Sequence, residues 1–125
     1  MRSLPRPRSC MRREVLLISE IIDAAERIID LSLGASVEDL DADRTRREAL
    51  LWSFTVLGEA CGQLDDDVRS AHQGVPWQAP RDLRNRVVHG YWQVSTSILL
   101  ATAQDDIPGF LEAVRVVQRS LGDGS

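Results

Sequence analysis

The sequence predicts an all-α protein, an up-and-down bundle of four to five helices whose last helix is kinked at Pro108. Apolar residues recur at the three-to-four-residue spacing of amphipathic helices along most of the chain. Glycine and proline separate these segments, and no segment alternates apolar and polar residues as a half-buried strand does. A chain of 125 residues buries enough surface for one domain. We expect this domain at residues 12–121, between a disordered Arg/Pro-rich leader at residues 1–11 and a flexible tail at residues 122–125.

The first expected helix begins at Arg12 and ends near Gly34, since glycine commonly terminates helices. Its apolar residues at helical spacing are Ile18, Ile21, Ile22, Ala25, Ile28 and Ile29. A polar connection at residues 36–43 follows. Asp41 or Asp43 can then cap a second helix by accepting a hydrogen bond from its first backbone amides.

The second expected helix runs to about Leu64 and is apolar on nearly all sides, which predicts that it is buried all round. One apolar stripe consists of Ala49, Trp52, Val56, Ala60 and Leu64, and Leu50, Phe54 and Leu57 widen it. Gly58 and Gly62 lie four residues apart on this helix, so another backbone can approach it closely. The acidic run 65–67 resembles a metal site. We interpret it as a helix cap and acidic first turn, because no further ligand with loop-like spacing follows.

A third helix is expected from Pro80, which suits the first position of a helix, to a stop at Gly90. Ser95 or Thr96 can cap a fourth helix. Pro108 interrupts that helix and should kink it or begin a new segment, because proline has no backbone N–H to donate.

Every one of the 15 basic residues is arginine. The absence of lysine excludes a phosphate loop ending in Gly-Lys-Ser/Thr, a Schiff-base lysine and a Ser-Lys dyad. Residues 1–13 hold five arginines and no acid, so residues 14–125 hold ten arginines and 19 acids, a net charge of −9. A body this acidic argues against non-specific nucleic-acid binding through overall charge. Binding to a phosphate backbone would need a local cluster of arginines.

The two cysteines and the hydropathy pattern indicate the expected compartment of the protein. Cys10 and Cys61 form no metal-binding or disulfide pattern, which suits a reducing compartment. No segment approaches the length of apolar sequence that spans a membrane, and the basic leader lacks the apolar centre of a secretory signal. We therefore expect a cytoplasmic protein without membrane association, metal or cofactor.

The stretch 81–92 carries the most chemistry, because it gathers one of two histidines, the only tyrosine and three arginines. On a helix, Asn85 and His89 lie four residues apart on one face. Arg84 lies about 140° from His89 around an ideal helix. Its long side chain can reach round toward the histidine, or the two residues can act across a dimer interface.

These residue types suit metal-free cleavage of RNA, in which the 2′-hydroxyl attacks the neighbouring phosphate. Such an enzyme needs a proton acceptor or donor with a near-neutral pKa, for which His89 fits, and a fixed cation, for which Arg84 fits. Asn85 can fix the imidazole tautomer or bind a phosphate oxygen, while Arg86 and Arg81 guide the backbone. The products would be a 2′,3′-cyclic phosphate and a 5′-hydroxyl. The alternative is a structural histidine beside a solvated arginine face.

The pattern Arg84-x4-His89-x-Tyr91 resembles the signature of the HepT family of HEPN-domain ribonucleases, which are toxins paired with MntA-type minimal nucleotidyltransferase antitoxins. Further similarity lies in three segments, Phe54-Thr55-Val56-Leu57-Gly58-Glu59-Ala60, Pro76-Trp77 and Asp106-Ile107-Pro108. The sequence departs from the family at Gly90, where an acid is frequent, and at Trp92-Gln93, where Phe-Gly is more usual.

The resemblance implies a HEPN bundle that forms a homodimer, with higher assembly left open, and whose two motif helices line a shared cleft. It implies metal-independent endoribonuclease activity on RNA with Arg84 and His89 catalytic, and inhibition by adenylylation of Tyr91 by the antitoxin. In such a dimer, two copies of Arg81, Arg84 and Arg86 would give the RNA a cleft of six arginines.

Two hypotheses of other classes remain open. The chain can be a non-catalytic HEPN module that binds a nucleotide or its nucleotidyltransferase partner and serves as a regulatory subunit. It can also be a purely structural helical dimer, in which Tyr91 is an amphipathic residue at the edge of the bundle.

Overall fold

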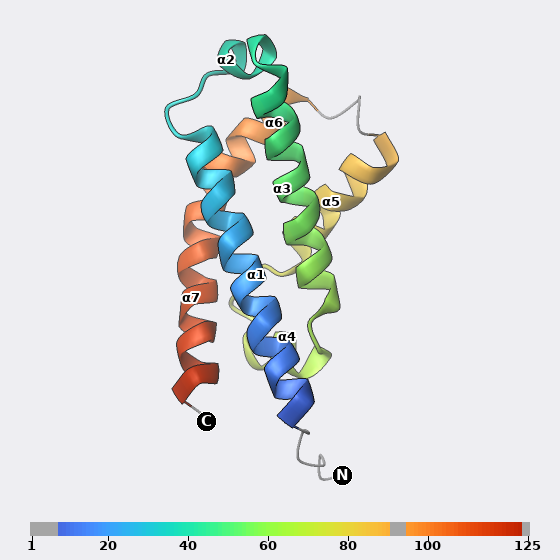
Figure 1. The fold of residues 1–125 in the computed structure, drawn as a ribbon, viewed down its shortest axis with the longest axis vertical. Coiled ribbons are helices and arrows are strands. Elements are labelled where there is room, and N and C mark those ends of the chain that lie inside the picture. Colours follow the sequence, from blue (N-terminus) through green and yellow to red (C-terminus); the bar gives the residue numbers. More distant parts are fainter. Residues whose placement is uncertain (1–7, 91–94, 124–125) are drawn as a thin grey trace.

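The computed structural model describes the backbone of residues 8–90 and 95–123 and the side chains of residues 12–85 and 95–122. Within these ranges the chain is helical and contains no strand, which confirms the predicted all-α class (Figure 1). The helices in chain order are α1 (Arg8–Ser32), α2 (Val37–Ala42), α3 (Arg44–Gln63), α4 (Asp66–Ala71), α5 (Gln78–Gly90), α6 (Thr96–Ala101), the π-helix η2 (Thr102–Asp106) and α7 (Ile107–Asp123).

The long helices form a bundle around α1, which packs against both α3 and α7, while α5 packs against α3 (Figure 1). Their buried faces meet in one apolar core whose fully enclosed large side chains include Ile18, Ile21, Ile28, Leu50, Leu51, Phe54, Leu57, Val114 and Val117. Trp77, just before α5, packs edge-on against Phe110 of α7 at a ring-centroid distance of 6.2 Å. The position of α5 is thus set by α3 and by the apolar turn that precedes it.

Helix α1 begins at Arg8, earlier than the expected start at Arg12, so the segment predicted to be a disordered leader overlaps this helix at residues 8–11. Residues 1–7 and 124–125 lie outside the described residues. At its other end, Gly34 adopts a left-handed φ of +67° and ends the helix as predicted. The last carbonyl groups of α1 accept hydrogen bonds from distant side chains, Arg46 to Leu31 at 2.6 Å and Gln104 to Ser32 at 2.8 Å. These bonds satisfy acceptors that a helix leaves unpaired at its C-terminus.

The connection expected at residues 36–43 contains the short helix α2. Ser36 and Asp39 form a reciprocal capping box at its start. The spacing Ser36-x-x-Asp39 is the sequence signal for this helix, in a variant with aspartate in place of glutamate. Helix α3 follows directly, capped by Asp43, which accepts a hydrogen bond from the Arg46 amide at 3.0 Å. Of the two aspartates considered for this cap, Asp43 is the one that serves.

The prediction that the second long helix is buried all round is wrong. Trp52 of α3 is 63% exposed, whereas Leu50, Phe54 and Leu57 are fully buried. The residues that seemed to widen the apolar stripe therefore form its buried centre. The first stripe is buried only at its C-terminal end, at Ala60 and Leu64, because α1 and α5 pack on α3 and leave the face of Trp52 open to solvent.

The acidic run and the prolines behave largely as predicted. Asp65 is the N-cap residue of α4, and the next two aspartates lie in its first turn, where carboxylates complement the helix dipole. Pro80 lies in the first turn of α5, which begins slightly earlier, at Gln78. The last helix is interrupted as expected, because η2 separates α6 from α7 and Pro108 is the second residue of α7. A π-turn accommodates a proline because it opens the helical hydrogen-bond ladder where the proline ring would clash.

Candidate functional site

The backbone of α5 is continuous from Gln78 to Gly90, so one helix carries Arg81, Arg84, Asn85, Arg86 and His89. Along an α-helix, Arg84 and His89 are separated by a rise of about 7.5 Å. The side chains of Arg86 and His89 lie outside the described residues, and so does Tyr91 altogether. The structure therefore places Arg84 and His89 on one helix and describes the side chains of that helix as far as Asn85.

Arg84 lies directly against the backbone of α3 at Gly58. A Cβ atom built on Gly58 would lie 2.3 Å from the Arg84 Cβ and 2.7 Å from the Pro80 carbonyl oxygen. Both are far inside the usual contact distance of about 3.5–4.0 Å between carbon atoms. The close approach predicted for the glycines of α3 is thus confirmed at Gly58, and its consequence is to bring Arg84 against α3.

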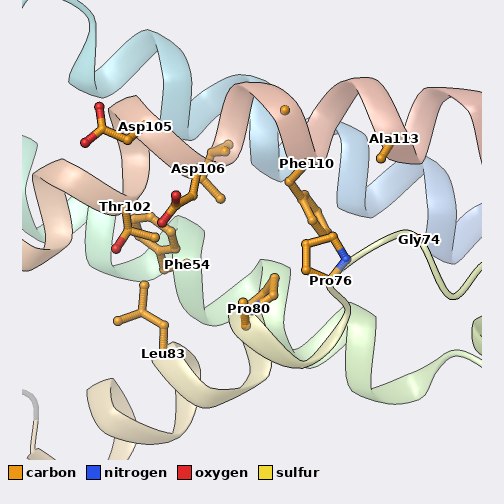
Figure 2. Close-up of a pocket in the computed structure, with 13 residues that line it drawn as sticks. Phe54, Gly74, Pro76, Pro80, Leu83, Thr102, Asp105, Asp106, Phe110 and Ala113 are labelled. Carbon is orange, nitrogen blue, oxygen red and sulfur yellow. The ribbon is translucent and has the colours of Figure 1, made fainter.

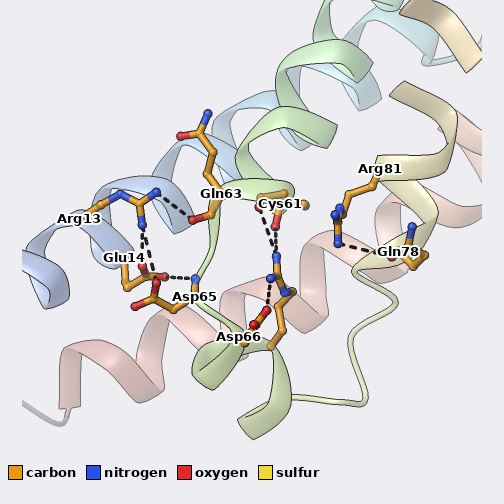
Figure 3. Close-up of polar contacts among 10 residues, drawn as sticks. Arg13, Glu14, Cys61, Gln63, Asp65, Asp66, Gln78 and Arg81 are labelled. Atoms are coloured by element: carbon orange, nitrogen blue, oxygen red, sulfur yellow. Dashed lines mark hydrogen bonds and ion pairs between the residues drawn. The ribbon is translucent and has the colours of Figure 1, made fainter. Parts of the chain in front are cut away.

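Gly62, one turn further along α3, faces Arg81 of α5. Its added Cβ would lie 3.5 Å from the Arg81 Nε, which is an ordinary contact. Arg81 donates a long hydrogen bond of 3.5 Å from Nη1 to the Gln78 side chain (Figure 3). The two arginines therefore lie beside successive turns of α3, and Asn85 is exposed.

Glu59 of α3 is the carboxylate that pairs with Arg84. The Arg84 Nε lies 3.7 Å from the Glu59 Oε1, with side-chain exposures of 28% and 49%. This Nε atom is buried and has no hydrogen-bond partner. A buried N–H without an acceptor is costly, so the neighbouring carboxylate offsets part of the cost through charge alone. Glu59 was not predicted as a site residue, because no sequence signal pairs a residue of α3 with one of α5.

Most other arginines of the described chain are tied to structural partners. Arg13 and Arg69 donate to the last carbonyl groups of α3, at 2.9 Å to Gln63 and 2.9 Å to Cys61 (Figure 3). Both also pair with carboxylates, Arg13 with Glu14 and Arg69 with Asp66. Arg27, Arg44 and Arg115 likewise pair with carboxylates within 3.2 Å. On α5, Arg84 reaches its carboxylate only at 3.7 Å and Arg81 has only the long hydrogen bond to Gln78, so neither makes a close ion pair among the described residues.

Another side of α5 faces an apolar groove, whose wall includes Phe54 of α3. Leu83 and Pro80 line this groove together with Phe110 of α7 and Asp106 of η2, and its volume is about 520 Å³. Figure 2 shows the Asp106 carboxylate directed toward Thr102 at one end of the groove. Its polar rim includes the carboxylates Asp105 and Asp106, so negatively charged groups are disfavoured there.

The buried thiol of Cys61 takes no part in this site. Burial raises the pKa of Cys61 to about 12, although Arg69 and Arg81 oppose the shift, so the thiol stays protonated and unreactive at neutral pH. Among the side chains that the structure describes, no group of three or more His, Cys, Asp or Glu residues is arranged to hold a metal ion. The helices in the described ranges include none long and apolar enough to cross a membrane.

The family described as ribonuclease HepT-like matches residues 21–117, which include the whole of α3 and α5. The chain belongs to the HepT-like ribonuclease family.

Individual relatives of this HepT-like chain have low sequence identity to it, but the alignments extend over most of both chains. A protein from Thermococcus cleftensis named a probable ribonuclease HepT is 26% identical over 91 residues, 73% of this chain and 83% of its own. A candidate RNase from Caldanaerobacter subterraneus subsp. tengcongensis is 28% identical over 80% of this chain and 89% of its own. A candidate RNase from Methanocaldococcus jannaschii is 24% identical over 78% of this chain and 90% of its own. No solved structure matches the HepT-like chain significantly.

Proposed function

We propose that this HepT-like ribonuclease is the toxin of a toxin–antitoxin pair and cleaves RNA without a metal ion, with Arg84 and His89 as its catalytic residues. The observation that carries the proposal is the position of Arg84. Its stem lies against Gly58, it sits on the same helix as His89, and its Nε faces a carboxylate only at 3.7 Å. A cation fixed in this way suits a phosphate whose negative charge grows in the transition state.

In the proposed reaction the 2′-oxygen of the RNA bonds to the adjacent phosphorus and the bond from phosphorus to the 5′-oxygen breaks. His89 accepts the proton of the 2′-hydroxyl, and a proton is returned to the leaving 5′-oxygen. Arg84 stabilises the charge on the non-bridging oxygens. Arg81, Asn85 and Arg86 contact the RNA backbone. The products are a 2′,3′-cyclic phosphate and a 5′-hydroxyl.

We further propose that the chain acts as a homodimer and is inhibited by a nucleotidyltransferase of the MntA type. A single copy offers few arginines on a body with net negative charge, whereas two copies of α5 across a two-fold axis would combine their arginines in one cleft. Adenylylation of Tyr91 would add a bulky, negatively charged group two residues after His89, which would repel RNA and occupy Arg84. Sedimentation at micromolar concentration tests the dimer, and intact mass after co-expression with the partner tests the modification.

Cleavage of labelled RNA by the purified protein in the presence of a chelator tests the chemistry. We expect His89→Ala and Arg84→Ala each to slow cleavage by about a hundredfold or more, as removal of a transition-state donor does in other enzymes. His72→Ala and Arg119→Ala are the matched controls, since they remove the other histidine and an exposed arginine of α7. Equal rates for the motif variants and the controls would refute the assignment. An unmodified wild-type protein that binds a nucleotide or its partner but does not cleave RNA would establish the regulatory module instead.

A further inference from the structure

We propose that Gly58 and Glu59 of α3 form a seat that orients Arg84 toward the substrate phosphate, so that Glu59 is a positioning residue of the ribonuclease. This inference rests on the catalytic role proposed for Arg84 above. It concerns two adjacent residues of one helix that contact the same arginine at different points. Gly58 receives the Arg84 stem, and Glu59 faces its guanidinium.

The first part of the seat is Gly58, which has no side chain. A Cβ there would lie 2.3 Å from the Arg84 Cβ and 3.0 Å from the Arg84 Cγ. Both atoms belong to the part of the arginine nearest its own backbone, so the stem of Arg84 is pressed against the α3 backbone. This contact fixes the direction in which the rest of the side chain leaves α5.

The Glu59 carboxylate then orients the guanidinium of Arg84. Glu59 Oε1 is 3.7 Å from Nε, the atom of the guanidinium closest to the stem, and this Nε is buried. A guanidinium has five N–H donors, of which Nε carries one and the two Nη groups carry four. Among the described residues the ion pair of Arg84 is made by Nε. The Nη groups are therefore left to bind two oxygens of one phosphate in the paired geometry that arginine favours.

A carboxylate beside an RNA site lowers affinity for RNA, because like charges repel. Glu59 is thus poorly explained as a residue for binding substrate. An interaction that holds a cation in place before the phosphate charge develops raises the rate of the chemical step instead. The seat therefore predicts slower cleavage without weaker RNA binding when the carboxylate is removed. A carboxylate that only masked Arg84 would give faster cleavage on removal.

The test replaces Glu59 with glutamine, which keeps the shape and removes the charge. Glu48→Gln is the matched control, because Glu48 lies on the same helix, is 45% exposed against 49% for Glu59, and also pairs with an arginine Nε, that of Arg44. Cleavage is measured in single turnover, and RNA binding by fluorescence anisotropy in a His89→Ala background. We expect Glu59→Gln to cleave about ten- to a hundredfold more slowly, the range a small misplacement of a catalytic group produces, with RNA binding equal or tighter.

The outcomes separate this inference from the proposed function. Wild-type protein without His89-dependent cleavage would refute the proposed function. Cleavage in the wild type with Glu59→Gln equal to Glu48→Gln, or faster than wild type, would refute the seat alone. A parallel loss of cleavage, RNA binding and thermal stability would also refute it, since that pattern indicates damage to the fold.

NMR of the arginine Nε–H groups tests the seat independently of activity. The buried Nε–H of Arg84 should exchange with solvent more slowly than that of the exposed Arg119, and should exchange faster in Glu59→Gln. Glu59→Asp should retain part of the protection because it retains the charge. Exchange at Arg84 as fast as at Arg119 in the wild type would overturn the proposal whether or not the protein cleaves RNA.

Discussion

Replacement of Gly58 with alanine adds one methyl group between α3 and α5 at their closest approach. The new Cβ would lie 2.3 Å from the Arg84 Cβ and 2.7 Å from the Pro80 carbonyl oxygen. Neither atom can rotate away, because one is fixed to the backbone of α5 and the other belongs to it. Restoring a normal carbon contact of about 3.5 Å requires α5 to move away from α3 by roughly 1 Å or more.

Two opposing effects decide the free energy of unfolding of this variant. Alanine in a helix interior is more favourable than glycine by about 0.5–1 kcal/mol. Forcing an extra methyl group into a packed contact costs about 1–3 kcal/mol, and an overlap this deep belongs in the upper part of that range. We therefore expect Gly58→Ala to lower stability by about 1–2 kcal/mol. At roughly 4 °C per kcal/mol for a domain of this size, the Tm should fall by about 4–8 °C.

Gly62→Ala is the control on the same helix, because its Cβ would meet the Arg81 Nε at an ordinary 3.5 Å. This variant should be as stable as the wild type or more stable by about 0.5–1 kcal/mol. Thermal and urea unfolding measure both variants, and RNA cleavage is compared well below either Tm. Cleavage by folded Gly58→Ala should be slow, because Arg84 moves with α5. A Gly58→Ala protein with the stability of Gly62→Ala and wild-type cleavage would show that α5 does not depend on the close contact.

Two further predictions concern residues that hold the bundle together. Burial raises the pKa of Cys61 from 9.0 to about 12, so the folded state favours the neutral thiol. The stability that this preference contributes should be fully present below pH 9 and should be lost as the pH rises toward 12. Mass mapping after thiol labelling of the native protein should find Cys61 unmodified near pH 9, and rapid labelling would contradict its burial. Arg69→Met removes the side chain that donates to the Cys61 and Gly62 carbonyl groups, so it should lower the free energy of unfolding by about 1–2 kcal/mol in urea. An unchanged urea midpoint would show that water satisfies these carbonyl groups equally well.

The long helices could be predicted from the sequence because their ends have local signals. Asp43 caps α3, Gly34 ends α1 and Pro108 marks the break in the last helix, and these signals act within one turn of the chain. The buried face of α3 could not be predicted in the same way. Trp52 and Leu50 are both apolar, and only the packing of α1 and α5 decides that the first is exposed and the second buried.

In the candidate site, too, the features within one helix could be predicted and the contact between two helices could not. Arg84 and His89 were predicted from their spacing on one helix, and the structure shows that α5 is indeed continuous between them. The pairing of Arg84 with Glu59 joins residues 25 positions apart on two helices, and no periodicity links them. Gly58 offered a partial signal, since a glycine inside a buried helix indicates close approach. The sequence did not indicate which residue approaches it.

The use of arginine in the structure suggests how an acidic chain could hold the phosphate of the proposed substrate. Arg13 of α1 and Arg69 of α4 donate hydrogen bonds to the carbonyl groups at the C-terminus of α3. Arg115 of α7 pairs with two glutamates. Their charge is balanced within the fold, so they add little potential for RNA. Arg84 differs because its one carboxylate stands 3.7 Å from Nε, too far for a hydrogen bond. In the proposed function, a bound phosphate pairs closely with the Nη groups of Arg84, and the negative charge elsewhere on the chain would disfavour RNA on other faces.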